Sequence, residues 1–253
     1  MPETLSEFKE LCAKLHEAGY EAIAPTQMED WTTRQLWLFP WGYDDNLADT
    51  FAKMQSGETK PADLDWVNKQ VDFLDVYKEE VGAKAFDDSS DTALAKIVAG
   101  KAAMMVQGDW NLKGGLSIDP DVKLGMAGIP ISDDADDCKI YMSLGTCTHI
   151  CSKSEYADLA AQFAEWWYTS ETALKWWSEE FGNAHCFKEL GMNVYPGMQQ
   201  AIDLLNNGKA GGWGSQVVPE EIVTEITPLC ERYILSNISR DEYLSMMAEK
   251  IVG

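Results

Sequence analysis

The sequence predicts an α/β protein, because short apolar segments typical of strands alternate with longer segments that have helical periodicity. Residues 102–107 and 124–129 are two such apolar runs, closed by Gly108 and Pro130. Around them, apolar residues recur at spacings of three and four, as they do on one face of a helix. Short strands between many helices are typical of the α/β class.

The N-terminal segment predicts a helix followed by a short strand. Thr4 and Glu7 fit a capping box, in which Thr4 is the N-cap and Glu7 returns the hydrogen bond. The apolar side chains that share one face of this helix are Leu5, Phe8, Cys12 and Leu15. Gly19 can supply the left-handed residue that ends the helix, and we expect residues 20–25 to be extended.

The central segment predicts two further helices before the strand at 102–107. Asp63 is the expected N-cap of the first helix. The apolar residues expected on its buried side are Leu64, Val67, Val71 and Leu74. Asp91 is the expected cap of the second helix, which covers residues 92–99 and is ended by Gly100.

The C-terminal half predicts an extended segment at 141–151 and then mostly helices. These helices are expected at residues 155–168, 171–181, 195–205, 220–235 and after a second capping box formed by Ser239 and Glu242. Pro228 should kink or split its helix, because proline has no N–H to donate. Four tryptophans at core spacing are expected to pack inside the protein: Trp166, Trp167, Trp176 and Trp177.

The charge of the chain excludes some partners. The sequence has 20 Lys and Arg against 42 Asp and Glu, a formal net charge of −22. Such a surface repels a phosphate backbone and an anionic membrane, so we expect neither nucleic acid nor membrane as a partner. No apolar run approaches the roughly 20 residues that span a bilayer, and the first residues do not have the pattern of a signal peptide.

The six cysteines have no zinc-type CxxC pairs, and we expect mostly buried thiols. The best metal-like cluster is Cys147, His149 and Cys151, whose spacing places three side chains on one face of a strand. The buried face of a strand is the alternative interpretation, since no fourth ligand is evident. We predict that Cys147 and Cys151 are not bonded to each other, because an extended chain would separate them by roughly 13 Å.

Three tryptophans outside the expected helices are candidates for ligand contact. Trp31 lies in an expected loop, Trp110 follows a strand, and Trp213 is surrounded by glycines. A flat apolar ring beside carboxylates suits a sugar, because the ring packs on C–H groups while carboxylates accept hydroxyl hydrogen bonds. The same rings could instead cover the edges of a core.

The order of several motifs resembles the family 1 extracellular solute-binding proteins, the maltose-binding type. The most specific is the family pattern F-x-x-G-K-A-A-M-x-x-x-G-x-W, to which residues 97–110, IVAGKAAMMVQGDW, are similar, with Ile97 in the Phe position. Residues 2–8, PETLSEF, are similar to the family's P-x-T-W-x-E-F, with Leu5 in the Trp position. Residues 125–130, GMAGIP, and 160–166, AAQFAEW, are similar to a later strand and helix of the family.

This resemblance implies a ligand site and no cofactor. Trp110 is the implied stacking ring, and the other residues implied at the cleft are Trp31, Trp213, Asp109, Asp30, Glu29, Gly145 and Thr146. The implied function is capture of a sugar or oligosaccharide, without catalysis, for delivery to the permease subunits of an ABC importer. The implied location is extracellular or periplasmic, with a lipid anchor on the full-length protein.

The resemblance also implies a periplasmic-binding-protein-like type II fold with two lobes. Residues 1–140 and 191–253 would form the second, C-terminal lobe, and residues 141–190 would belong to the first. Family members begin with a secretion signal and about half of the first lobe, whereas this chain begins at the PETLSEF helix. We therefore expect mostly the C-terminal lobe, with self-association or mobility of residues 155–190.

Two other functions stay open from the sequence alone. Acidic loops with tryptophan would also suit a polyamine or another small organic cation, through cation–π contact. A thiol- or metal-dependent enzyme that uses Cys147, His149 and Cys151 is the alternative from a different class. We find no P-loop, GxSxG or HExxH motif in the sequence.

Overall fold

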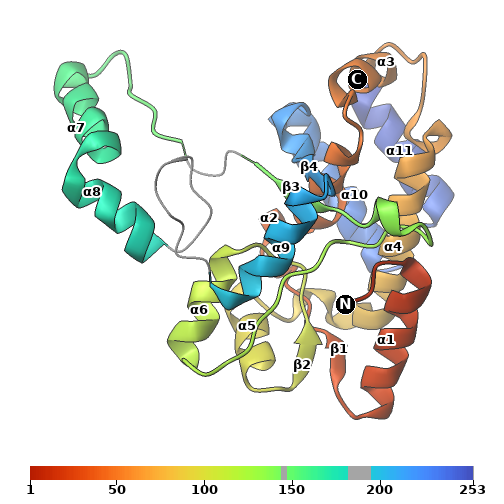
Figure 1. The fold of residues 1–253 in the computed structure, drawn as a ribbon. Helices are drawn as coiled ribbons and strands as arrows, with labels where there is room; N and C mark the ends of the chain where they lie inside the picture. The colour runs from red at the N-terminus through yellow and green to blue at the C-terminus, as the bar shows by residue number, and fades with distance from the viewer. Residues whose placement is uncertain (144–146, 182–194, 253) are drawn as a thin grey trace.

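The computed structural model describes residues 1–143, 147–181 and 195–252. It confirms the α/β class, with two small parallel sheets set among helices (Figure 1). Strand β1 (Glu21–Ile23) pairs with β2 (Ala102–Met104), and Ile23 lies opposite Met104. Strand β3 (Ile140–Met142) pairs with β4 (Ala210–Gly212), which brings together segments far apart in the sequence.

Helix α1 (Leu5–Glu17) begins as its sequence predicts. The Glu7 N–H donates to the Thr4 hydroxyl at 3.2 Å, so Thr4 is the N-cap. The Glu7 carboxylate accepts from the N–H of Glu3 at 2.9 Å, one residue earlier than in a standard capping box. Gly19 has a φ of +84°, which ends the helix and turns the chain into β1.

Seven helical segments join β1 to β2. They are α2 (Asp30–Trp37), η1 (Phe39–Tyr43), α3 (Leu47–Gln55), η2 (Pro61–Asp63), α4 (Asp65–Val81), η3 (Gly82–Phe86) and α5 (Ser90–Val98). Two of the expected N-caps are wrong. The Asp63 carboxylate accepts from the Lys60 N–H and closes the short turn η2, so α4 starts later. The hydroxyl of Ser89, in place of Asp91, caps α5 by accepting from Thr92 N–H.

The segment after β2 differs most from expectation. Trp110 begins a helix, α6 (Trp110–Ile118), which sequence periodicity did not predict. The strand expected at 124–129 does not form; among the described residues this stretch has a single bridge, between Ile129 and Lys139. The short turn η4 (Ala135–Asp137) then leads into β3.

The C-terminal segments, from residue 196 onward, contribute two long helices to the main core. They are η6 (Pro196–Met198), α9 (Gln199–Asn206), β4, η7 (Gly214–Gln216), α10 (Glu220–Ile234) and α11 (Arg240–Val252). The second capping box is confirmed, since Ser239 N–H donates to Glu242 and Glu242 N–H donates to Ser239. Pro228 lies inside α10 without splitting it. Packing offsets the lost hydrogen bond, because neighbouring side chains of α10, such as Ile226 and Leu229, are buried in the core.

The main hydrophobic core lies where α1, α2, α4, α10 and α11 meet around β1. Trp37 and Trp41 are fully buried in it, with ring centroids 5.5 Å apart in an edge-to-face arrangement. Gln70 of α4 donates to the carbonyls of Leu36 and Trp37. This side chain satisfies the carbonyls at the end of α2 and fixes α2 against α4.

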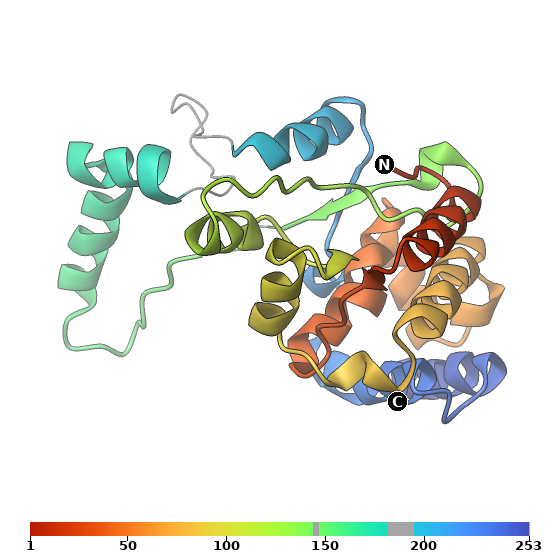
Figure 2. The same cartoon turned by 90° about the horizontal axis from the view of Figure 1, so that it is seen from below.

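Two helices stand apart from the rest of the molecule, residues 1–143 and 195–252, which we call the body. Helix α7 (Ala157–Thr169) and α8 (Glu171–Trp176), with the π-helical turn Trp177–Phe181, project to one side in both views (Figures 1 and 2). We call residues 157–181 the arm. The expectation that its four tryptophans pack in a core is wrong for Trp166 and Trp176, which are exposed. Among the described residues, both contact other rings of the arm.

Among the residues described, none of the helices combines the length and the apolar composition that crossing a bilayer requires.

Candidate ligand-binding site

Three of the predicted site residues lie together. The ring centroids of Trp31 and Trp110 are 6.1 Å apart, and those of Trp110 and Trp213 are 6.4 Å apart at nearly a right angle. Each ring follows the carboxyl end of a strand along the chain: Trp31 follows β1, Trp110 follows β2 and Trp213 follows β4. The crevice beyond the carboxyl ends of parallel strands is the usual ligand position in α/β proteins. We call these rings the tryptophan cluster.

Trp110 occupies the centre of the cluster because of the glycine before it. A Cβ on Gly108 would lie 2.2 Å from the Trp110 ring, so only glycine lets the ring lie over this backbone. The indole N–H of Trp110 donates to the Gln107 side-chain oxygen at 3.0 Å. These two contacts fix the ring at the first residue of α6.

Trp213 is held by a close approach of two backbones. A Cβ on Gly42 would lie 1.4 Å from the carbonyl oxygen of Gly212, so β4 packs directly on η1. This contact lets Trp213 stack on Phe39, with centroids 4.1 Å apart and planes 5° from parallel. The Trp213 N–H donates to the Tyr141 carbonyl at 3.0 Å, which anchors the ring to β3.

Trp31 lies in the first turn of α2 and not in the loop that the sequence suggested. The helix starts early because the Thr32 hydroxyl lies 2.6 Å from both the Thr26 and the Glu29 carbonyl oxygens, which share its single hydrogen, and this contact fixes the turn. Trp31 is 38% exposed, so an apolar surface remains available beside the Trp110 ring.

The predicted carboxylates are already engaged with the protein. Glu29 accepts from the Ser90 N–H at 2.9 Å and so supports the start of α5. Asp30 lies 4.0 Å from Arg34, which also pairs with Glu220 at 2.8 Å. Asp109 immediately precedes α6 and is half-buried.

Acidic groups are close together on this side of α2. Burial, and then the charge of Asp30, raise the pKa of the Glu231 carboxyl. The site therefore combines apolar rings with hydrogen-bond acceptors of negative charge, an arrangement that can hold hydroxyl groups or a cation.

Sequence reasoning missed the polar side chains behind the rings. Gln107 accepts from Trp110 and from the Gln35 amide at 3.2 Å, and it donates to the Ser90 hydroxyl at 2.8 Å. Gln35 is buried. The only signal in the sequence was a polar residue, Gln107, at the end of an apolar run. Phe39 was visible as part of the aromatic-rich stretch at 31–43, but its partner Trp213 comes from a distant segment.

Other predicted site residues are not brought to the cluster. Gly145 and Thr146 lie outside the described residues. Cys147, His149 and Cys151 are all exposed, so the buried strand face expected for them is wrong. Cys12, Cys138 and Cys230 are buried as expected, and Cys186 lies outside the described residues. In the part of the chain that the structure covers, no group of three or more His, Cys, Asp or Glu could hold a metal ion.

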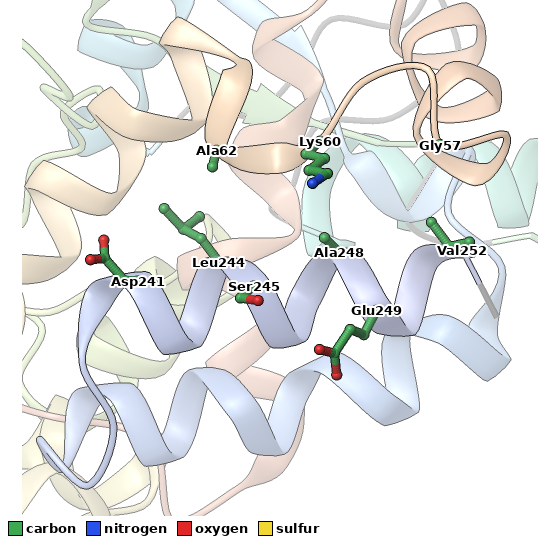
Figure 3. Close-up of a pocket in the computed structure, with 9 residues that line it drawn as sticks. All are labelled: Gly57, Lys60, Ala62, Asp241, Leu244, Ser245, Ala248, Glu249 and Val252. Atoms are coloured by element: carbon green, nitrogen blue, oxygen red, sulfur yellow. The ribbon is translucent and has the colours of Figure 1, made fainter.

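Two surface cavities lie elsewhere. The larger, about 630 Å³, lies between α11 and the α3–η2 connection and is lined by Lys60, Leu244 and Glu249 among others (Figure 3). The second, about 270 Å³, separates residues 104–108 from residues 123–130. Neither cavity includes the rings of the tryptophan cluster. Trp31 is exposed, and Trp110 and Trp213 are half-buried.

Comparisons with known proteins give the family. A model of the bacterial extracellular solute-binding proteins matches residues 1–188. A search of curated protein sequences found no match.

Solved structures with the same fold include several sugar-binding proteins. A chitin oligosaccharide binding protein has a TM-score of 0.74 at 15% identity, over 99% of this chain and 64% of its own. A sugar transporter from Bacillus licheniformis in complex with stachyose has a TM-score of 0.72 at 10% identity, over 99% of this chain and 66% of its own. RafE in complex with raffinose has a TM-score of 0.71 at 15% identity, over 99% and 65%. This chain thus spans about two thirds of the length of these proteins.

These likenesses identify the fold as periplasmic-binding-protein-like, of the two-lobe type. Since the family match covers most of the sequence and the fold agrees with it, the chain belongs to the bacterial extracellular solute-binding protein family.

Proposed function

We propose that this chain captures a saccharide on the tryptophan cluster for delivery to an ABC importer. The observation that carries the proposal is the contact of the Trp110 ring with Trp31 on one hand and with Trp213 on the other. Indole faces pack well on the C–H faces of sugar rings, and neighbouring acceptors bind the hydroxyls. Similar structures with bound stachyose and raffinose support the same ligand class.

In this proposal Trp110 is the central stacking ring. Its neighbours Trp31 and Trp213 extend the apolar surface on either side. The resemblance to the family adds Asp109, Asp30 and Glu29 as acceptors for hydroxyl groups. It also adds Gly145 and Thr146, from the segment that returns toward the other lobe.

The proposed lobes are residues 1–140 with 191–253, and residues 141–190. Strand β3 (residues 140–142) pairs with residues 210–212 of the first grouping, so the chain would cross to the other lobe just after β3. The arm, which stands away from the body, supports the second (Figure 2). Lys113 of α6 donates to the Glu180 carbonyl and so links the body to the arm. Closure of one lobe on the other about the connecting segments would cover a sugar on the rings.

The family is extracellular, and we propose that the protein works outside the cytoplasmic membrane beside the permease subunits of its importer. A lipid anchor on the full-length protein would keep it there. The negative charge of this chain does not favour direct binding to anionic lipid.

Calorimetric titration with a ligand panel tests the proposal. The panel contains raffinose, stachyose, chitin oligosaccharides and xylo-oligosaccharides, with spermidine and putrescine as organic cations. We expect heat and a change in tryptophan fluorescence with at least one saccharide and none with the cations. Binding of a polyamine without any saccharide would replace the proposed function by cation capture.

A further inference from the structure

The Gln107 side chain connects three elements beneath the tryptophan cluster. Its oxygen accepts from Trp110 of α6 at 3.0 Å and from Gln35 of α2 at 3.2 Å. Its nitrogen donates to the Ser90 hydroxyl of α5 at 2.8 Å. The two donors, Trp110 and Gln35, bond to the Gln107 oxygen, and the acceptor Ser90 bonds to the Gln107 nitrogen. These partners therefore determine which way round the Gln107 amide lies.

The Trp110 ring has two supports, and only one of them fixes its rotation. The missing Cβ of Gly108 gives the ring room to lie over the backbone, but this space alone does not determine which way the indole edge faces. The hydrogen bond from the indole N–H to Gln107 does determine it, because it ties one edge of the ring to one atom. A ring without that bond can turn about its two side-chain torsions.

The other end of the network is buried and therefore stiff. Gln35 is 4% exposed. Within the described residues, the Gln35 side-chain oxygen has no hydrogen-bond partner. The amide nitrogen of Gln35 then depends on Gln107, since loss of that bond would leave a second buried polar atom without a partner. Through these hydrogen bonds, the position of α2 helps to set the orientation of the Trp110 ring.

We propose that Gln107 is a positioning residue, which holds the Trp110 ring in the orientation that receives a sugar. This inference rests on the proposed function, because it assigns the Trp110 ring to sugar stacking. Gln107 need not touch the ligand: it acts through the indole N–H.

A double-mutant cycle with Gln107→Met and Trp110→Phe tests this. Methionine matches glutamine in length but its thioether sulfur accepts hydrogen bonds only weakly, and phenylalanine keeps a flat ring but has no N–H. We expect Gln107→Met to weaken sugar binding about five- to tenfold in the wild-type background, as for one lost hydrogen bond. In the Trp110→Phe background the same change should weaken binding less than about twofold, because the bond is already absent. Equal losses in both backgrounds would overturn the proposal.

Gln107→Glu is the conservative variant. A carboxylate still accepts from the indole N–H and from Gln35, and the Ser90 hydroxyl can turn to donate to it. We expect affinity within about threefold of wild type. Loss as large as that of Gln107→Met would show that the acceptor is not what matters, and would contradict the proposal.

A ligand-free measurement separates this inference from the proposed function. Trp110→Phe identifies the Trp110 indole N–H resonance among those of the ten tryptophans. We expect slow hydrogen exchange at this N–H in the wild type and in Gln107→Glu. In Gln107→Met we expect exchange at least tenfold faster, and accelerated more than at the buried Trp37 indole N–H, which reports the loss of global stability from the unpaired Gln35 amide. If no saccharide binds the wild type, the proposed function fails and the exchange rates still decide whether Gln107 holds the ring. Unchanged exchange in Gln107→Met would show that it does not.

Discussion

Helices α4 and α7 have similar sequence patterns and opposite surroundings. Both have apolar residues at helical spacing. The residues of α4 that are buried are Val67, Gln70, Val71, Phe73, Leu74, Val76, Tyr77 and Val81, whereas α7 has no buried residue. Periodicity therefore tells which face of a helix is apolar, but only the tertiary structure tells what covers that face.

The same contrast separates the two groups of tryptophans. In the body, Trp110 and Trp213 donate their N–H groups to acceptors on other segments or on the preceding turn. In the arm, the Trp177 N–H donates to the carbonyl of Trp167, also within the arm. The body rings are thus fixed to a large core, while the arm rings mainly contact one another.

The largest expected effect follows from the core of the body. Trp37→Ala removes a fully buried ring and its hydrogen bond to Thr227 at 3.3 Å. We expect the free energy of unfolding to fall by about 3–5 kcal/mol, from lost burial and the cavity left behind. The measurement is chemical denaturation followed by circular dichroism.

The matched substitution in the arm is Phe163→Ala, which should change the free energy of unfolding by less than about 0.5 kcal/mol. Phe163 is 58% exposed, so truncation leaves no cavity. A loss above about 2 kcal/mol for Phe163→Ala would show that the arm is part of the cooperative core, and the comparison would fail.

The second effect concerns binding. In the full-length protein, Trp110→Ala should weaken saccharide affinity by about 2–4 kcal/mol, as for a buried aromatic anchor. Trp166→Ala is the control in the arm, because Trp166 is also partly exposed and contacts other rings. We expect calorimetry to find no change for this control. Equal affinities for Trp110→Ala and wild type would remove Trp110 from the site.

Predictions from the sequence succeeded where the cause is local. The caps at Thr4 and Ser239 need only residues of the same turn, and both are present. Asp63 and Asp91 are not the N-caps because nearby groups form other hydrogen bonds. The Asp63 carboxylate accepts from the Lys60 N–H, and the Thr92 N–H donates to the Ser89 hydroxyl.

Features that depend on distant segments could not be predicted in this way. The contact of Gly42 with Gly212 and the link of Gln35 to Gln107 join residues far apart in the sequence. Residues 124–129 have the composition of a strand but pair only at Ile129, since a ladder requires a neighbour as well as propensity. The meeting of Trp31, Trp110 and Trp213 was expected from the family resemblance and not from periodicity.

The third effect tests a buried polar contact in the body. Asp137 is buried and accepts from Ser132 at 2.6 Å, Tyr43 at 2.5 Å and Lys69 at 3.0 Å. Burial raises the pKa of Asp137, but these three partners outweigh burial and hold the pKa below its ordinary value. We expect Asp137→Asn to lower the free energy of unfolding by about 1–3 kcal/mol at pH 7.

The pH dependence gives the sign of this contribution. A carboxyl whose pKa is lower in the folded state stabilises the fold above the unfolded-state pKa of about 4, and the stabilisation is lost as pH falls through the folded value. The difference between wild type and Asp137→Asn should therefore shrink below about pH 4. The control is Asp136→Asn, since the Asp136 side chain is 91% exposed and should contribute less than about 0.5 kcal/mol. A difference that is constant with pH would show that the charge of Asp137 is not responsible.

The smallest effect concerns what covers the arm. Its exposed apolar side chains are Leu159, Phe163, Trp166 and Trp176, with Tyr156 just before it. Monomeric proteins rarely expose so many large apolar residues side by side. We therefore expect the 253-residue chain to self-associate through the arm, in a concentration-dependent way.

Phe163→Gln tests this expectation, because it removes one apolar ring from the exposed face and keeps a helix-forming residue. Neighbouring rings already cover part of Phe163, with centroids 5.7 Å from Trp166 and 6.2 Å from Trp167, so burial in a dimer gains only part of a full side chain. We expect association to weaken by about 1 kcal/mol, roughly fivefold, in sedimentation at several concentrations. The control Glu165→Gln changes an exposed polar residue of the same helix and should leave association within about twofold. A wild-type chain that stays monomeric at all concentrations would show that the apolar face of the arm remains exposed to solvent. The body and the arm would then differ in how well their apolar residues are buried, but the arm would not be an interface for self-association.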